Sequence, residues 1–152
     1  MESSKGKGAE PRPARPDELQ DILQLLQDCG LPTDGVRDQF PAAYAVVRVD
    51  GRLAAVAGLE SYVEAGLLRS VAVHPSARGQ GFGRTLVEDR LRAARSKGLR
   101  HIYLLTTTAA DYFREMGFVD CARAAAPAEL RRSPELAGAC PCSAVCLRRA
   151  LP

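Results

Sequence analysis

The sequence predicts an α/β protein with a central mixed sheet flanked by helices, and three observations carry that prediction. A hairpin signal lies in the first half, where YAVVRV and RLAAVAGLE (44–60) flank the turn dipeptide Asp50-Gly51. A strand (66–73), a glycine-rich loop, a helix (about 81–97) and a strand (101–106) then follow in the order of a crossover, which connects parallel neighbours. The 152 residues are enough for one sizeable hydrophobic core.

The N-terminal half is predicted to hold a polar tail, two helices and the hairpin. Residues 1–10 are rich in Gly, Ser and Lys, so we expect a flexible tail ahead of a single domain at 11–152. After Pro16, apolar residues recur at helical spacing, and Gly30 ends the helix that they predict. A short second helix is expected around 33–40. The apolar positions of the first helix are Leu19, Ile22, Leu23, Leu26 and Cys29.

The C-terminal half is predicted to add two helices and three strands. In the helix at 81–97 the buried stripe is expected to be Val87, Leu91 and Ala94. The segment DYFREMG predicts a short helix that ends at Gly117. The remaining expected elements are a strand at 118–123, a partly helical stretch at 126–138 and a last strand at 142–150.

Composition and charge exclude several classes of protein. The 21 basic and 18 acidic side chains give a net charge of +3, which is too even for a nucleic-acid-binding surface. No apolar run approaches the roughly 20 residues of a membrane span. The basic N-terminus is not followed by an apolar stretch, so we expect no secretory signal, a cytoplasmic location and free thiols for the five cysteines.

The glycine-rich loop ARGQGFGR is the strongest motif in the chain. A Walker A loop needs a lysine that is absent here, and a dinucleotide fingerprint would need glycine where Arg84 stands. What remains is R-x-x-G-x-G at Arg78, Gly81 and Gly83, between a strand and a helix. Unpaired N–H groups at a helix start stabilise a pyrophosphate, and the two arginines add charge-assisted bonds. The alternative is a glycine-rich turn without a ligand.

The segment LLRSVAVHPSARGQGFGRTLVEDRL (67–91) closely resembles the acetyl-coenzyme A signature of the GNAT acetyltransferase superfamily. The resemblance extends in element order over nearly all of 11–152. It implies a twisted mixed sheet of about six to seven strands, in the order strand, two helices, three strands, helix, strand, helix, two strands. It also implies acetyl-coenzyme A as cosubstrate, with its pyrophosphate on the loop and its pantetheine arm along the preceding strand. The implied coenzyme-binding residues are Val71, Ala72, Val73, Arg78, Gly79, Gln80, Gly81, Phe82, Gly83 and Arg84.

A narrower resemblance concerns the acceptor. LLTTTAADYFREMGF (104–118) is similar to the Leu-Thr-Thr segment and Gly-Phe helix of N-acetylglutamate synthase domains. Together with DCGLP (28–32), GLE (58–60) and the segment at 126–145, it makes the chain most similar to small acetyltransferases associated with bacterial arsenic resistance. Both resemblances imply a small amine acceptor like glutamate, which includes arsenic- or phosphorus-containing analogues.

Acetyl transfer to an amine needs a base for the acceptor and donors for the oxyanion. We predict Glu60 as the base, because it ends the second hairpin strand beside the expected thioester; the alternative is a solvated carboxylate without a role. Glu64 is the second candidate, and a water relay serves with either. A backbone N–H of the strand at 70–73 is the expected oxyanion donor. Arg69, with Ser70 beside it, is the candidate for the acceptor's carboxylate, the alternative being an ordinary surface arginine.

The residue expected to act as general acid for the departing thiolate departs from the family pattern. The family's tyrosine four residues before the glycine of Gly-Phe is Phe113 here, and Tyr112 stands one step earlier. That step rotates a helical side chain by about 100°, so Tyr112 is no simple substitute; the alternative is a tyrosine of the pocket or surface. A thiol pKa of about 8.5 lets the thiolate leave with little help, so we still expect a working transferase. Phe113 and Thr107 join the implied coenzyme site, although Thr106–Thr108 have helix capping as their alternative role, above all Thr108.

The cysteines near the C-terminus raise the question of a metal. Cys140, Cys142 and Cys146 offer three soft ligands, but their spacing matches no zinc module and no histidine is near. We therefore expect buried thiols and no metal.

Two other functions stay open at this point. One is acetylation of a protein N-terminus or lysine. The other is a non-catalytic sensor that binds acetyl-coenzyme A, or arsenite through the three cysteines. The sequence does not determine the acceptor or the oligomeric state, for which a homodimer is one candidate.

Overall fold

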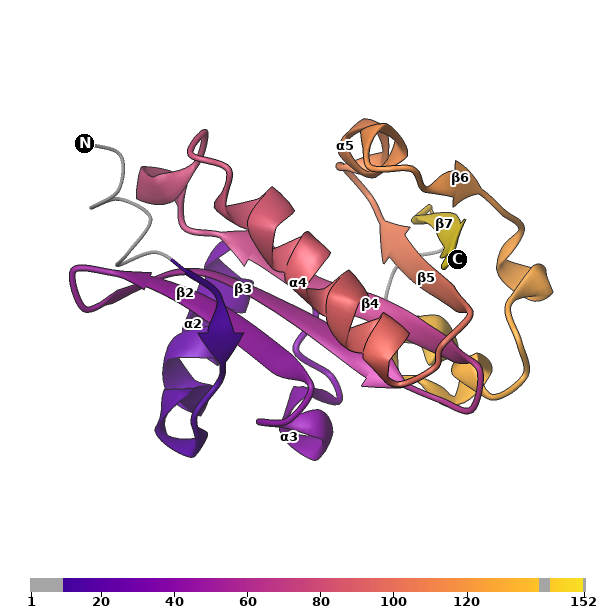
Figure 1. Cartoon of the computed structure of the whole chain (residues 1–152), viewed down its shortest axis with the longest axis horizontal. Helices are drawn as coiled ribbons and strands as arrows, with labels where there is room; N and C mark the ends of the chain where they lie inside the picture. Colours follow the sequence, from indigo (N-terminus) through magenta and orange to yellow (C-terminus); the bar gives the residue numbers. More distant parts are fainter. Residues whose placement is uncertain (1–9, 140–142, 152) are drawn as a thin grey trace.

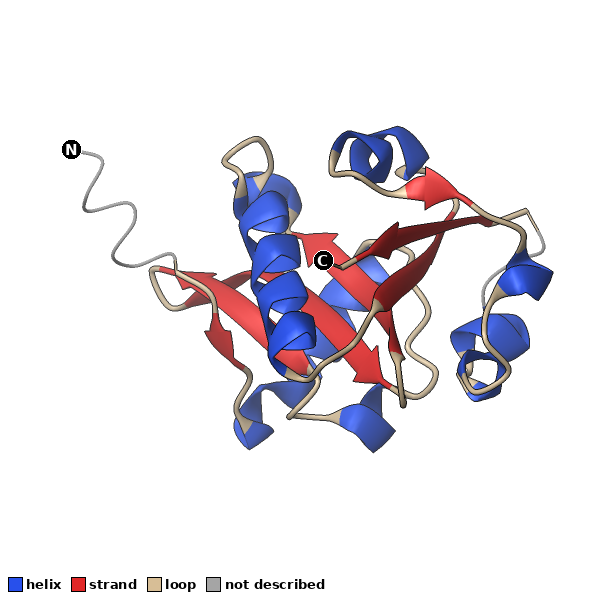
Figure 2. Ribbon diagram, turned by 45° about the vertical axis from the view of Figure 1, so that its right-hand side comes forward, coloured by secondary structure: helices blue, strands red, loops and turns tan. Residues whose placement is uncertain are grey.

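A seven-stranded mixed sheet forms the centre of the molecule, with helices on both of its faces (Figures 1 and 2). The computed structural model describes residues 10–139 and 143–151. The strand order is β1-β2-β3-β4-β5-β7-β6, and only β4 and β5 run parallel. The strands are β1 (Arg12–Pro13), β2 (Tyr44–Val49), β3 (Arg52–Ser61), β4 (Ala65–Val73), β5 (His101–Thr106), β6 (Val119–Asp120) and β7 (Val145–Ala150).

The helices divide between the two faces of the sheet. Helix α4 buries Leu86 and Val87 against one face. Helix α2 buries Ile22 and Leu26 against the other, together with Val56 of β3. The helices are α2 (Leu19–Asp28), α3 (Val36–Gln39), α4 (Phe82–Ser96) and α5 (Ala110–Glu115), and the short turns are η1 (Pro16–Glu18), η2 (Pro75–Ala77), η3 (Arg123–Ala125), η4 (Leu130–Arg132) and η5 (Glu135–Ala139). The order of helices and strands expected from the sequence is therefore confirmed.

Most predicted boundaries agree with the structure, and the differences lie at the C-terminal end. The hairpin and the helix at 81–97 are present, and Val87, Leu91 and Ala94 are buried as predicted. The strand expected at 118–123 is only two residues long, because the chain turns into η3 soon after it. The strand expected from 142 begins at Val145. Nearly all of the expected N-terminal tail (1–10) lies outside the described residues.

A bulge in β4 changes which face its side chains occupy. Val56 pairs with Ala72 and Gly58 with Arg69, so Ser70 and Val71 stand opposite the single residue between them on β3. Ser70 has a φ of 59°, a left-handed conformation that is uncommon for serine. Such a bulge bends the strand and redirects its backbone groups, and bulges are frequent beside active sites.

The parallel pairing of β4 with β5 is short, and this opens the sheet. Ala65–Leu67 pair with His101–Tyr103, and the ladder ends there. Beyond Leu67 the two strands diverge (Figure 1), and the rest of β4 turns its edge toward open space. We call this space the β4–β5 cleft.

Three thiols are free among the described residues, Cys29, Cys121 and Cys146. The Sγ atoms of Cys121, just after β6, and Cys146, in β7, lie 3.1 Å apart. Burial, together with the hydrogen bond between the two thiols, raises the pKa of the Cys146 thiol to about 12. Within the described ranges no group of three or more His, Cys, Asp or Glu side chains could hold a metal, and no helix there has the length and apolar character to cross a bilayer. Cys140 and Cys142 lie outside these ranges.

Glu18 joins the N-terminal strand to the hairpin. Its buried carboxylate accepts hydrogen bonds from Arg12 at 2.7 and 3.0 Å, from Arg48 Nε at 2.7 Å and from the Arg15 N–H at 2.8 Å. The hydrogen bonds from Arg12, followed by those from Arg48 and Arg15, lower the pKa of Glu18 to about 2.

We expect Glu18→Gln to lower the free energy of unfolding by about 2–3 kcal/mol at pH 7. Since the pKa of Glu18 is lowered in the folded state, its contribution is complete above the unfolded pKa near 4.5 and disappears as the pH falls toward 2. Urea unfolding from pH 7 to pH 2.5 should show the difference from the wild type shrinking. Asp17→Asn, at the exposed neighbour, is the control and should cost less than about 0.5 kcal/mol. A loss of stability in Glu18→Gln that stays constant with pH would contradict the lowered pKa of Glu18.

Candidate functional site

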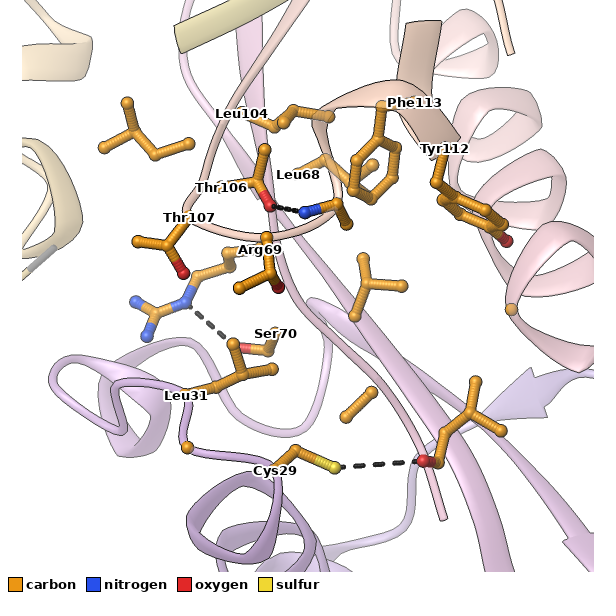
Figure 3. A pocket seen from close by; sticks show the side chains of 18 of the residues that line it. Cys29, Leu31, Leu68, Arg69, Ser70, Leu104, Thr106, Thr107, Tyr112 and Phe113 are labelled. Carbon is orange, nitrogen blue, oxygen red and sulfur yellow. Dashed lines mark hydrogen bonds between the residues drawn. The ribbon is translucent and has the colours of Figure 1, made fainter. Parts of the chain in front are cut away.

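The β4–β5 cleft has a volume of about 930 Å³ (Figure 3). Its floor is formed by β4 from Leu68 to Val73 and by the end of β5. The loop between α2 and α3, the start of α4, helix α5 and residue Glu135 form the walls. The cleft thus connects the glycine-rich loop with the bulge in β4.

At one end, the glycine-rich loop presents the start of α4. Gly79 and Gly81 line the cleft with φ values of 81° and 85°, and no side chain caps the helix at Gly81. The first N–H groups of α4 and the adjacent Arg78, which donates to the Val73 carbonyl at 3.2 Å, give this end a positive potential. An anion such as a diphosphate fits it.

Two loop residues from the predicted set lie away from the cleft. Gln80 lines a different hollow beside the hairpin. The Arg84 side chain is 53% exposed and lies 3.9 Å from Glu88 on the surface of α4. The structure therefore places Arg78 at the anion end, and it does not place Arg84 there.

Along the cleft, β4 offers an open backbone edge. Val71, Ala72 and Val73 all line it. Because the ladder with β5 ends at Leu67, this side of β4 has no strand partner within residues 10–139 and 143–151. An extended ligand with amide groups can pair with such an edge as a further strand would.

Tyr112 and Phe113 form the wall opposite β4 (Figure 3). Phe113 is buried in the core. Its ring packs edge-to-face against the ring of Tyr112, with 5.1 Å between the ring centroids. The Tyr112 hydroxyl lies 2.9 Å from where a Cβ on Gly83 would stand, and so beside the first turn of α4. Burial raises the pKa of Tyr112, which keeps its hydroxyl protonated.

The threonines at the end of β5 divide their roles differently from the prediction. Thr106 Oγ1 accepts the Ala109 N–H at 3.0 Å, directly before α5 (Figure 3). The capping role predicted for Thr108 is therefore wrong, because the chain turns so that Thr106 reaches the helix start first. Thr107 and Thr108 both line the cleft.

At the other end of the cleft lies a buried ion pair. Arg69 is 3% exposed and Glu60 is 1% exposed, and Arg69 Nη1 donates to Glu60 Oε2 at 2.9 Å. The second oxygen of Glu60 accepts the Tyr62 hydroxyl at 2.7 Å. Both prior alternatives, a solvated Glu60 and a surface Arg69, are wrong, because β3 and β4 turn the two side chains toward the same covered face.

Only some members of this group reach the cleft. Arg69 and Ser70 line it, and Arg69 Nε donates to Ser70 Oγ at 3.1 Å (Figure 3). Glu60 is not among the lining residues, although we predicted it beside the thioester. Its carboxylate accepts the hydrogen bond from Arg69 without lining the cleft itself.

Sequence reasoning missed Glu135. This side chain is 3% exposed, lines the cleft and lies 3.5 Å from Arg69 Nε. It comes from η5, about 65 residues along the chain from its partner in β4, in a stretch read only as partly helical. The one available signal was an acidic residue in SPELAG, the tail of the narrower resemblance.

Comparison with known proteins finds a family and related folds. A model of the acetyltransferase (GNAT) family matches residues 9–118. The amino-acid acetyltransferase of Aliivibrio fischeri is 34% identical over 118 residues, which cover 72% of this chain and 26% of that protein. The chain thus spans about a quarter of the length of this curated relative.

Two solved structures share the fold. The N-acetylglutamate synthase of Neisseria gonorrhoeae, complexed with coenzyme A and N-acetyl-glutamate, superposes with a TM-score of 0.81 at 22% identity, over 95% of this chain and 35% of that one. Rv2747 of Mycobacterium tuberculosis, solved with coenzyme A, superposes with a TM-score of 0.79 at 19% identity, over 93% and 99%.

Proposed function

Because the chain belongs to the acetyltransferase (GNAT) family, we propose that it transfers an acetyl group from acetyl-coenzyme A to the amino group of a small amino acid. One observation carries the proposal above the others. A single cleft runs from the uncapped start of α4, along the open edge of β4, to a buried charged group behind the β4 bulge.

The proposed binding of the coenzyme is supported by the positive potential at the start of α4 and by the open backbone edge of β4. The first N–H groups of α4 and Arg78 suit the pyrophosphate, because both supply positive potential without a competing carboxylate among the residues that line that end. The amides of the pantetheine arm suit the open edge at Val71 and Val73. Two relatives in fold were solved with coenzyme A, which supports the same placement.

The chemistry we propose is direct attack of the amine on the thioester, without a covalent enzyme intermediate. Backbone N–H groups beside the bulge at Ser70 would stabilise the oxyanion, because the bulge redirects them from the β3 ladder. Tyr112 keeps its proton and lies on the coenzyme side, so it is the candidate donor to the departing thiolate. The thiolate leaves readily in any case, since a thiol pKa is about 8.5.

For the acceptor, the named relatives support an amino acid. The curated relative is an amino-acid acetyltransferase, and one of the two structures holds N-acetyl-glutamate. We propose a glutamate-like amino acid as the first candidate, with arsenic- and phosphorus-containing glutamate analogues in the same class.

The test is an acceptor screen in two steps. Calorimetry should first detect coenzyme A and acetyl-coenzyme A binding. Thiol release from acetyl-coenzyme A should then rise with at least one small amino acid, in a panel of glutamate, its arsenic and phosphorus analogues, neutral amino acids and a peptide with a free N-terminus. Activity on the peptide alone would favour the protein-acetylating alternative. Binding without turnover on any amine would favour a sensor, and absence of binding would end the proposal.

A further inference from the structure

Two cysteines face one another where β6 ends beside β7. The two strands pair antiparallel as far as Asp120 and Leu147 (Figure 1), so Cys121 and Cys146 come next in register. The Cys121 N–H donates to the Cys146 carbonyl at 3.0 Å, and the two Sγ atoms lie 3.1 Å apart. Residues opposite one another in antiparallel strands have Cα atoms about 4.5–5.5 Å apart, within the range of about 4.4–6.8 Å that a disulfide spans. The backbone is therefore already placed for a bond between the two sulfurs.

The two thiols differ in their access to solvent. Cys146 is 5% exposed and belongs to an apolar cluster with Leu67 and Tyr103, whereas Cys121 is half-buried at the margin of that cluster. Burial is the main reason why the pKa of the Cys146 thiol is raised, and the hydrogen bond between the two thiols adds to the rise. A reactive cysteine must be accessible and must give up its proton. Cys121 is therefore the thiol that a reagent from solvent meets first.

The third thiol within residues 10–139 and 143–151 has different surroundings. Cys29 follows α2, and its Sγ atom lies 3.8 Å from the Val73 carbonyl oxygen and 3.8 Å from Arg78 Nη2. Among the three described thiols, only Cys121 and Cys146 contact one another. Cys29 therefore offers a control for any reaction that requires two neighbouring thiols.

We propose that Cys121 and Cys146 form a dithiol site that undergoes reversible exchange with small disulfides of the glutathione type. Cys121 first loses its proton to water, and its thiolate attacks one sulfur of the small disulfide. The S–S bond of the small disulfide breaks, and one small thiolate leaves with the electron pair. Cys146 then loses its proton to water and attacks the Cys121 sulfur, which releases the second small thiolate. Two protein thiols are oxidised, and one small disulfide is reduced to two thiols that take up the two protons.

The new bond closes a loop that borders the β4–β5 cleft. The two cysteines are 25 residues apart, and the chain between them carries η3, η4 and η5, with Glu135 and Ala144 on the cleft lining. A cross-link between the ends of such a segment restricts the unfolded chain and so favours the folded one. We expect the midpoint of urea unfolding to be about 1 M higher in the oxidised chain than in the reduced chain.

The test exposes the full chain to glutathione buffers, from fully reduced to about a tenfold excess of the oxidised form, and traps the remaining thiols with iodoacetamide. Trypsin then places Cys121 in the peptide 115–123 and Cys146 in the peptide 133–148. The second peptide also contains Cys140 and Cys142, so the digest is repeated on the double variant Cys140→Ser, Cys142→Ser. Mass spectrometry should find the two peptides joined in both proteins, in chains that run as monomers without reductant. Excess reduced glutathione should separate them again.

Three variants make the test specific. Cys29→Ser is the matched control, and it should keep both the joined peptide and the shift in urea midpoint. Cys121→Ser should lose both, and Cys146→Ala should leave Cys121 carrying one glutathione. The proposal is overturned if the wild type shows no joined peptide in the most oxidising buffer, if the link disappears in the double variant, or if it joins two chains. Acetyl transfer is not measured in any step, so the outcome is separate from that of the proposed function.

Discussion

Replacing Arg69 by methionine is expected to lower the free energy of unfolding by about 3–5 kcal/mol. The substitution leaves Glu60 and Glu135, which are 1% and 3% exposed, without the guanidinium that lies between them. Removing one partner of a buried ion pair is strongly destabilising, because a buried charge then loses the opposite charge beside it. Urea unfolding at pH 7 measures the loss.

Two further variants make the prediction specific. Arg69→Met combined with Glu60→Gln should recover part of the stability, because one of the two buried charges is gone. Arg114→Met removes an arginine with two carboxylate partners on the surface, Asp111 and Asp120, and should lower the free energy of unfolding far less than Arg69→Met does. Equal losses for Arg69→Met and Arg114→Met would show that burial of the Arg69 group contributes little.

The parts of the fold that sequence reasoning predicted are those with local signals. Asp50-Gly51 marks the hairpin turn, and the glycine-rich loop after β4 marks the start of α4. Each of these signals depends on a few consecutive residues, so it predicts the local structure without any knowledge of the tertiary contacts. The same loop lies at one end of the cleft, so the place of that end in the fold was predictable in outline.

The inner end of the site was not predictable in the same way. Glu60 is the last inward residue of a strand, and its environment depends on Arg69 of the next strand, which in turn contacts Glu135 of η5. The bulge at Ser70 has no glycine or asparagine to announce it. The chain leaves β5 so that Ala109 is the N-cap of α5 and donates its N–H to Thr106, whereas a count along the sequence favoured Thr108 as the cap. Each feature is a product of tertiary contacts, which override local preference.

The two ends of the cleft carry different groups. The first N–H groups of α4 and Arg78 lie at one end, and Arg69 and Glu135 lie at the other. Between them lies the bulge in β4, where the edge of the strand is open to the cleft.

Gly81→Val is expected to weaken coenzyme A binding by about 10²- to 10⁴-fold. Gly81 has a φ of 85° and lines the cleft, and a Cβ there would meet no protein atom within 4 Å, so a side chain would enter the space left for the ligand. It would separate the phosphates from the first N–H groups of α4. Each lost hydrogen bond to a charged group is worth about 1.5–3 kcal/mol, and two of them account for the range.

Gly98→Val is the matched control at the opposite end of the same helix. Gly98 has a φ of 80°, an added Cβ there also meets nothing within 4 Å, and it does not line the cleft. Both variants carry similar backbone strain, which urea unfolding should show as similar losses of stability. Calorimetry should show coenzyme A binding weakened only by Gly81→Val. Equal affinities in the two variants would mean that the start of α4 does not hold the pyrophosphate, and the coenzyme would then have to enter the cleft from another side.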